Sequence, residues 1–288
     1  MTTAATRFGP RLQKAMGELG PLCAGIDPHP GLLAAWGLPD DVQGLRTFAF
    51  TAGEAFDGYA AAIKPQAALF ERFGAQGMVV LEELVQQLRA SATPSQVILD
   101  AKRGDIGSTM TAYAQGYLAN TSTFSADALT VSPYLGFESL RPAIDIGAEN
   151  GNGLFVLALT SNPEGASVQH VGGAQGQSVA AQIVASAAQE NSQHSDGWGD
   201  IGLVVGATIK DAAKKLGIDF TGLNGPILAP GIGAQGGTAA DLRDVFGTGI
   251  SQVLPSVSRE VLQQGPSIKG LRQKISQTAS QMQATLAG

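Results

Sequence analysis

Four charged residues follow an apolar run in segment 97–109, which reads Val-Ile-Leu-Asp-Ala-Lys-Arg-Gly-Asp-Ile-Gly-Ser-Thr. The apolar run predicts a buried strand, and because side chains alternate along a strand, Asp100 and Lys102 should point to the same face. Opposite charges at the end of a buried strand are costly to desolvate, so they form either a structural ion pair or part of a functional site. Asp105 and Thr109 complete a longer pattern, Asp-x-Lys-x-x-Asp-Ile-x-x-Thr, which favours the functional interpretation.

Two later segments together predict a phosphate site. Segment 230–237, Pro-Gly-Ile-Gly-Ala-Gln-Gly-Gly, matches the glycine spacing of a dinucleotide fingerprint, but that fingerprint normally opens the first strand–helix unit of its domain, and this segment comes near the chain's end. A glycine-rich loop before a helix can still bind an anion through its backbone N–H groups; a tight turn that requires glycine is the alternative. Ser256-Val-Ser-Arg259 follows the next apolar run, where the Arg259 guanidinium could hold phosphate oxygens.

Lys64 and Asp27 end two other apolar runs. A lysine at a strand end could form a Schiff base, as in an aldolase, or could be held in a salt bridge. A metal site is not expected, because the single cysteine, Cys23, lies inside an apolar run and the three histidines show no metal-ligand spacing. The Gly-x-Ser-x-Gly motif of a serine nucleophile does not occur in the sequence.

Composition argues against several classes of function. The chain has 288 residues, of which 44% are hydrophobic and 15% are charged, so a well-buried core is expected. Its net charge of -6 and the lack of any basic run argue against nucleic-acid binding. No apolar stretch approaches the roughly 18 residues that span a bilayer, and the N-terminus lacks the pattern of a signal peptide. These features predict a cytoplasmic protein without a membrane partner.

Short apolar runs recur eight times along the chain, each followed by polar, Gly or Pro residues, and helical periodicity lies between them. Eight strand–helix units in a chain of this length predict an α/β fold, the (β/α)8 TIM barrel; an open doubly wound sheet is the alternative. Active sites of such barrels lie at the carboxyl ends of the strands, where the residues described above occur. The runs are 22–26, 60–63, 97–99, 128–131, 154–159, 201–205, 227–229 and 252–254.

We expect a single domain over residues 1–288, because no internal repeat or break in composition marks a boundary. Residues 163–199 are rich in Gly, Ser, Gln and His, which predicts a mobile insertion over the barrel mouth, although residues 179–189 within it carry a helical pattern. Residues 266–286 predict a C-terminal helix that packs outside the barrel.

The chain resembles orotidine 5′-phosphate decarboxylases and, in the length of its connecting segments, the larger branch of that family. The resemblance rests on the pattern from Asp100 to Thr109, on segment 230–237 and on Arg259, which keep the family's order along the chain. It implies a homodimeric (β/α)8 barrel that converts orotidine 5′-phosphate to uridine 5′-monophosphate (UMP), the last step of de novo pyrimidine synthesis, without a metal or an organic cofactor.

The resemblance also implies roles for single residues. Lys102 would protonate C6 as carbon dioxide leaves, and Asp100 would lie near the scissile carboxylate. Asp105 and Thr109 would reach into the partner subunit's site, where Asp105 completes an alternating charge array with Lys64. The other expected substrate contacts are Asp27 and Lys64 to the ribose, Ser161 to the pyrimidine, and Gln235, Gly236, Ser258 and Arg259 at the phosphate end. Asn162-Pro163 and Ser258 depart from the more familiar pattern of the family.

Two other functions fit part of the sequence. A related barrel enzyme could act on a sugar phosphate, either as a magnesium-dependent decarboxylase of a keto-sugar phosphate or as a Schiff-base aldolase that uses Lys64 or Lys102. A barrel without catalytic activity could bind a nucleotide for regulation, but the intact Asp-Lys-Asp array argues against it.

Overall fold

The computed structural model describes residues 7–172, 176–232 and 239–287, and at its centre is a closed barrel of eight parallel strands. The strands pair in sequence order, and β8 returns to pair with β1, which confirms the predicted (β/α)8 TIM barrel and excludes the open sheet. The strands are β1 (Cys23–Ile26), β2 (Ala62–Pro65), β3 (Gln96–Arg103), β4 (Ala128–Val131), β5 (Gly153–Leu159), β6 (Ile201–Val205), β7 (Ile227–Pro230) and β8 (Val253–Val257).

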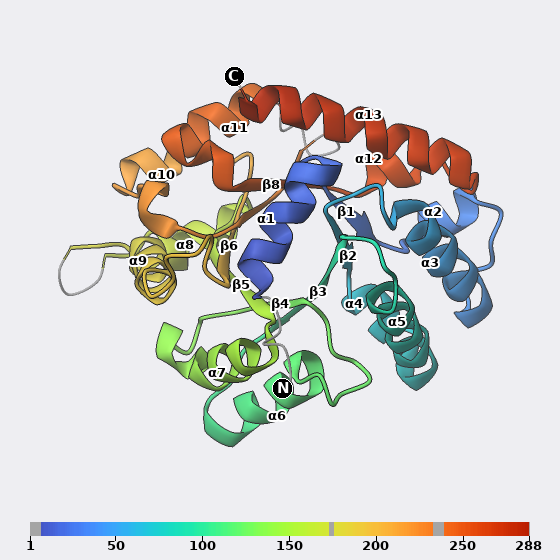
Figure 1. Ribbon diagram of the computed structural model, residues 1–288, viewed down its shortest axis with the longest axis horizontal. Coiled ribbons are helices and arrows are strands. Elements are labelled where there is room, and N and C mark those ends of the chain that lie inside the picture. The colour runs from blue at the N-terminus through green and yellow to red at the C-terminus, as the bar shows by residue number, and fades with distance from the viewer. Residues whose placement is uncertain (1–6, 173–175, 233–238, 288) are drawn as a thin grey trace.

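Helices surround the strands, with α1 lying across the middle of the barrel in the view of Figure 1. No helix in the described part of the chain is both long and apolar enough to cross a membrane. The longer helices are α1 (Phe8–Leu19), α3 (Val42–Phe56), α5 (Gly74–Arg89), α6 (Gly107–Leu118), α7 (Arg141–Asn150), α9 (Val179–Asn191), α11 (Ala239–Phe246) and α13 (Ile268–Ala287). The short ones are α2 (Pro30–Ala35), α4 (Ala68–Glu71), α8 (Ala166–Gln169), α10 (Ala212–Lys215), α12 (Arg259–Leu262) and the 3-10 turns η1 (Phe137–Leu140), η2 (Pro163–Gly165), η3 (Thr221–Leu223) and η4 (Gly247–Gln252).

Helix α1 closes the end of the barrel at which the strands begin. Its side chains Phe8 and Leu12 are fully buried and belong to the cluster that fills the barrel interior with Ile98 and Leu254. Arg11 forms an ion pair of 2.8 Å with Asp127, which directly precedes β4. A binding site inside the barrel is therefore confined to the opposite end, where the strands finish.

Four strands, β2, β3, β7 and β8, extend past the carboxyl ends of the apolar runs that predict them, and β3 and β8 extend furthest. β3 continues through Asp100 to Arg103, and β8 continues to Val257. Polar residues stay in these strands because neighbouring strands supply backbone partners: Ser256 pairs in register with Cys23 of β1, and Asp100 forms a bridge with Gln66. Three of the candidate catalytic residues, Lys64, Asp100 and Lys102, are thus held by strand backbone, whereas Asp105 lies in the loop after β3.

The segment predicted as an insertion contains one of the barrel helices. Helix α9 covers β5 and β6 with a buried face that includes Ile183 and Val184, and its N-terminus is capped by Ser178, whose side chain accepts a 3.1 Å hydrogen bond from the Ala181 N–H. The residues between β5 and α9 include η2 and α8. Mobility of this region remains a prediction. At the other end of the chain, α13 lies where the sequence predicts a C-terminal helix and packs against α3.

Candidate active site

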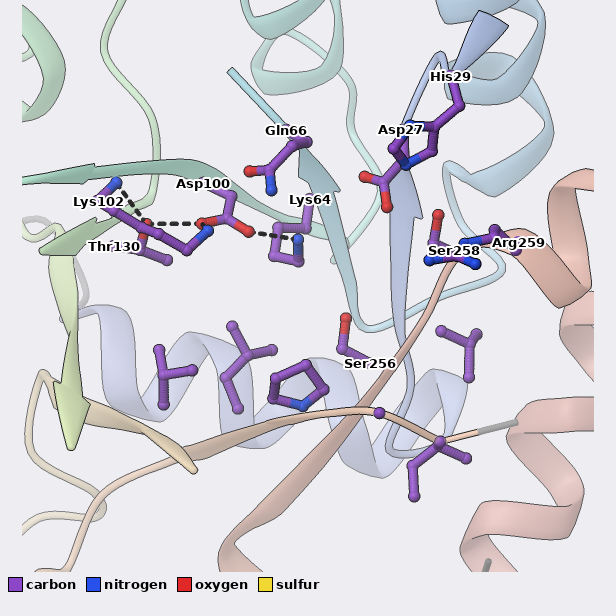
Figure 2. A pocket seen from close by; sticks show the side chains of 16 residues that line it. Asp27, His29, Lys64, Gln66, Asp100, Lys102, Thr130, Ser256, Ser258 and Arg259 are labelled. Atoms are coloured by element: carbon purple, nitrogen blue, oxygen red, sulfur yellow. Dashed lines mark hydrogen bonds and ion pairs between the residues drawn. The ribbon is translucent and has the colours of Figure 1, made fainter. Parts of the chain in front are cut away.

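A pocket of about 250 Å³ lies at the carboxyl ends of the strands, and six of the residues singled out in the sequence line it. They are Asp27, Lys64, Asp100, Lys102, Ser258 and Arg259. Figure 2 shows that the pocket has two polar sides, which are made by different strands. Lys64, Gln66, Asp100, Lys102 and Thr130 lie on one side, and Asp27, His29, Ser258 and Arg259 on the other.

Asp100 is the centre of the first side. Its Oδ2 receives a 2.7 Å hydrogen bond from Lys64 Nζ, and its Oδ1 receives one of 2.6 Å from Lys102 Nζ. Thr130 Oγ1 donates to the same Oδ1 at 2.9 Å, and the Gln66 amide nitrogen, when turned toward Asp100, lies 3.1 Å from Oδ2 and 2.8 Å from the backbone oxygen. Both carboxylate oxygens are therefore held by two donors each, which leaves the carboxylate little freedom to rotate.

The charges of this cluster are mutually stabilised. Burial opposes ionisation of Asp100, but the ammonium groups of Lys64 and Lys102 outweigh it and hold the pKa of Asp100 well below its usual range. Burial likewise disfavours the charged form of Lys64, but attraction to Asp100 and Asp27 outweighs it and raises the pKa of Lys64 above its ordinary value. At neutral pH the pocket therefore contains a carboxylate between two lysines, and the buried one of these lysines is firmly protonated.

Lys102 has an uncommon backbone conformation. Its φ of 49° lies in the left-handed region, which costs a residue with a side chain on the order of 1–3 kcal/mol. The register between β3 and β4 shifts between Leu99 and Arg103, so Lys102 leaves the regular ladder, and its N–H donates instead to Thr130 Oγ1 at 2.9 Å. The strand end is therefore irregular at Lys102, yet both Asp100 and Lys102 line the pocket.

The second side presents buried polar atoms that the described residues leave without a hydrogen-bond partner, namely Asp27 Oδ1 and Ser258 Oγ. A buried oxygen without a partner is costly, so these atoms suit the hydroxyl or phosphate groups of a ligand. Gly25 is required beside them, because a Cβ there would lie 2.9 Å from Ser258 Cβ and 3.4 Å from Asp27 Oδ1. Arg259 begins α12 and also lines this side of the pocket.

The other five expected site residues are not among the described residues that line the pocket. Gln235 and Gly236 fall outside the described residues. Ser161 is exposed after β5 and does not line the pocket. Asp105 and Thr109 lie on the segment from β3 into α6, where Thr109 is exposed, and they do not line this chain's pocket either. Their expected place is a partner subunit's site, which a single chain does not test.

Sequence reasoning missed three polar residues that line the pocket: His29, Gln66 and Thr130. Ser256, in the segment predicted to bind phosphate, lines it as well. A signal existed for two of the missed residues. Gln66 follows Lys64 at the strand spacing of two, and Thr130 is a polar residue inside an apolar run. For metal binding, the described residues contain no group of three or more His, Cys, Asp or Glu side chains that could hold an ion.

The fold and the pocket define a (β/α)8-barrel protein with a charged site at the carboxyl ends of its strands. Comparisons with known proteins show which family of such barrels it belongs to. The family model "Orotidine 5'-phosphate decarboxylase / HUMPS family" matches residues 20–273. This chain belongs to that family, which confirms the resemblance seen in the sequence.

Individual relatives match over nearly their whole length. The chain is 53% identical to an orotidine 5'-phosphate decarboxylase of Salinispora arenicola over 98% of this chain and 99% of that protein. It is 55% identical to one from Streptomyces coelicolor over 92% of this chain and 93% of the other. A crystal structure of a putative orotidine 5'-phosphate decarboxylase from Streptomyces avermitilis is similar with a TM-score of 0.94 and 51% identity, covering 99% of this chain and 98% of that one.

Proposed function

We propose that this chain is an enzyme that decarboxylates orotidine 5′-phosphate to UMP in pyrimidine synthesis, without a metal or an organic cofactor. Membership of the family and the names of its relatives support this substrate. The observation that carries the proposal is the array of Lys64, Asp100 and Lys102 in the pocket, with Arg259 on the opposite side. The array offers a fixed proton donor at one end, and the arginine offers a phosphate partner at the other.

In the reaction, the bond between C6 and the carboxylate carbon breaks, carbon dioxide leaves, and the electron pair stays on C6. The Lys102 ammonium stabilises that developing charge and transfers a proton from Nζ to C6. Asp100 lies beside the substrate carboxylate, and such a like-charge contact costs about 4 kcal/mol at 4 Å for an effective dielectric near 20. That repulsion is relieved as carbon dioxide departs, while contacts to the remote phosphate hold the substrate in place.

The second side of the pocket binds the ribose phosphate. Asp27 Oδ1, which has no partner among the described residues, accepts a hydrogen bond from a ribose hydroxyl, and Lys64 also contacts the ribose. Ser258 and Arg259 bind the phosphate. Gln235 and Gly236, which lie outside the described residues, remain expected phosphate contacts, and Ser161 remains the expected pyrimidine contact. Ser161 would have to approach the pocket when substrate binds.

We further propose a homodimer in which the partner subunit's site receives Asp105 and Thr109. The surface next to Asp105 supports this, because large apolar side chains are exposed there after β3 and β4: Ile106 is 62% exposed, Leu135 52% and Tyr134 79%. Apolar groups gathered on a surface favour association with another chain. In the dimer, Asp105 would extend the charge array of Lys64, Asp100 and Lys102. A cytoplasmic location stays a prediction from the sequence.

An aldolase is the second candidate. A Schiff-base lysine must lose its proton to act as a nucleophile, and a depressed pKa serves this purpose. Lys64 has the opposite property, because Asp100 and Asp27 raise its pKa. Product analysis separates the candidates: the proposal predicts one carbon dioxide and one UMP per orotidine 5′-phosphate consumed. Borohydride trapping of a sugar phosphate on the protein, with orotidine 5′-phosphate left unchanged, would contradict it.

Arg259→Ala is expected to weaken UMP binding by about 1.5–3 kcal/mol, the usual worth of a hydrogen bond to a charged group, and to change uridine binding little. Calorimetric titration of both ligands measures the difference. Arg46→Ala is the control, because this arginine pairs with Glu83 and does not line the pocket. Equal losses for UMP and uridine would refute the phosphate role of Arg259.

Mixing inactive Asp105→Ala and Lys102→Ala subunits is expected to restore activity. If each site takes Lys102 from one subunit and Asp105 from the other, a mixed dimer has one intact site. Random redistribution of equal amounts then restores about a quarter of wild-type activity. The measurement is turnover before and after the subunits are allowed to exchange. No recovery, in a sample shown to contain mixed dimers, would contradict the shared site.

A further inference from the structure

Thr130 is a buried polar residue inside the site for which the proposed chemistry supplies no role. It lies in β4 between Leu129 and Val131, is only 1% exposed, and lines the pocket. Its hydroxyl makes two hydrogen bonds to the array: it accepts from the Lys102 backbone N–H and donates to Asp100 Oδ1, each at 2.9 Å. Thr130 therefore contacts both of the residues expected to act on the scissile bond (Figure 2).

The direction of these two bonds is fixed by chemistry. A threonine hydroxyl has one proton to donate. The Lys102 N–H can only donate, and the ionised Asp100 carboxylate can only accept, so the hydroxyl proton must point at Asp100. The Thr130 side chain thus has one orientation that satisfies both neighbours, and no water is needed to complete it.

These bonds close a ring around the proposed proton donor. Lys102 Nζ contacts the same Asp100 Oδ1 at 2.6 Å, so the ring runs from the Lys102 backbone through Thr130 and Asp100 to the end of the Lys102 side chain. The lysine needs such a constraint, because its side chain is 45% exposed and its backbone has the left-handed φ of 49°. Without the hydroxyl, the Lys102 N–H would lose its acceptor, and Asp100 Oδ1 would lose one of its two donors.

We propose that Thr130 is a positioning residue for the decarboxylation: its hydroxyl sets the distance between the Lys102 backbone and the Asp100 carboxylate, and thereby the place of Nζ relative to C6. The inference rests on the proposed function. It adds to the site a residue that acts through Lys102 and Asp100. A sequence motif built from charged residues does not include this threonine.

The test compares variants that separate the hydroxyl from the side-chain volume. Thr130→Val keeps the shape and removes the hydroxyl, and Thr130→Ser keeps the hydroxyl and removes a methyl group. We expect Thr130→Val to lower kcat about 100-fold, the effect of misplacing a reacting group by about 1 Å, and to change UMP affinity less than about threefold. Thr130→Ser should retain kcat within about threefold of wild type.

Thr278→Val is the matched control, because Thr278 is equally buried at 2% exposure but bonds to the Lys274 backbone in α13, away from the pocket. It should leave kcat unchanged. Should Thr130→Val fail to unfold cooperatively, Thr130→Ala against Thr130→Ser makes the same comparison.

The outcomes separate this inference from the proposed function. Wild-type protein that does not turn over orotidine 5′-phosphate overturns both. Active wild type together with a Thr130→Val variant of similar kcat overturns the positioning role alone. Equal losses in the serine and valine variants would also overturn it, because they would show that the methyl packing matters and the hydroxyl does not.

Discussion

Lys102→Ala is expected to lower kcat by about 10³-fold or more while UMP still binds. General acid catalysis by a positioned group contributes about 10²–10⁴-fold, and loss of a fixed ammonium also removes electrostatic stabilisation of the charge on C6. Binding should survive, because Asp27, Ser258 and Arg259 lie on the other side of the pocket and Lys64 is unchanged. The measurement is kcat and UMP affinity of the same preparation.

The fold should tolerate the Lys102→Ala change. Asp100 keeps its 2.7 Å contact with Lys64, so no buried charge is left alone. Lys214→Ala serves as the control, since this exposed lysine of α10 does not line the pocket. A Lys102→Ala enzyme with more than about a tenth of wild-type kcat would contradict the role of Lys102 as the proton donor.

Asp100→Ala is expected to have the largest effect on stability, about 3–5 kcal/mol lower free energy of unfolding, and to abolish turnover. The loss arises because Lys64, with a side chain only 8% exposed, is left as a buried charge without its main partner. Urea unfolding measures the change. Asp145→Ala is the control: its 3.8 Å contact with Arg141 is at the surface, and such pairs contribute about 0–1 kcal/mol.

Replacing both charges should separate stability from activity. The double variant Lys64→Met/Asp100→Leu removes the buried pair and is expected to recover most of the lost stability, because apolar side chains of similar volume often replace such pairs without cost. It should remain inactive. A double variant no more stable than Asp100→Ala would show that the destabilisation does not come from an unpaired Lys64.

The pH of these unfolding experiments follows from the pKa shifts. The lowered pKa of Asp100 stabilises the fold above the unfolded value of about 3.9, and this contribution is lost as pH falls below it. The raised pKa of Lys64 stabilises the fold below the unfolded value of about 10.4, and this contribution is lost as pH rises past the folded pKa. At pH 7 the pair contributes fully, so the variants are compared there.

The sequence predicted those parts of the site that depend on neighbours along the chain. Strand alternation predicted Asp100 and Lys102 on one face, and both line the pocket although the Lys102 backbone departs from a regular strand. The rule for barrel strands predicted Lys64, Asp27 and Arg259 at the same end of the barrel, and all three line the pocket. These residues lie near or shortly after the ends of strands whose apolar runs are visible without a structure. Their catalytic and binding roles remain predictions.

Other parts depend on strand pairing, which a sequence does not contain. Thr130 bonds to Asp100 from 30 residues away, and only the register of β3 on β4 brings the two together. The left-handed backbone of Lys102 arises from the register shift in the same pair of strands, and lysine gives no hint of it. The helical pattern within residues 163–199 was visible, but its place as the barrel helix α9 required the packing against β5 and β6.

The most direct test of the central claim is the ultraviolet absorbance change of orotidine 5′-phosphate with purified protein that has been treated with a chelator. We expect rapid and complete conversion to UMP in the chelated sample, with no gain when magnesium is restored. Folded protein that leaves the substrate unchanged, or that acts only after magnesium is added back, would contradict a metal-free decarboxylase.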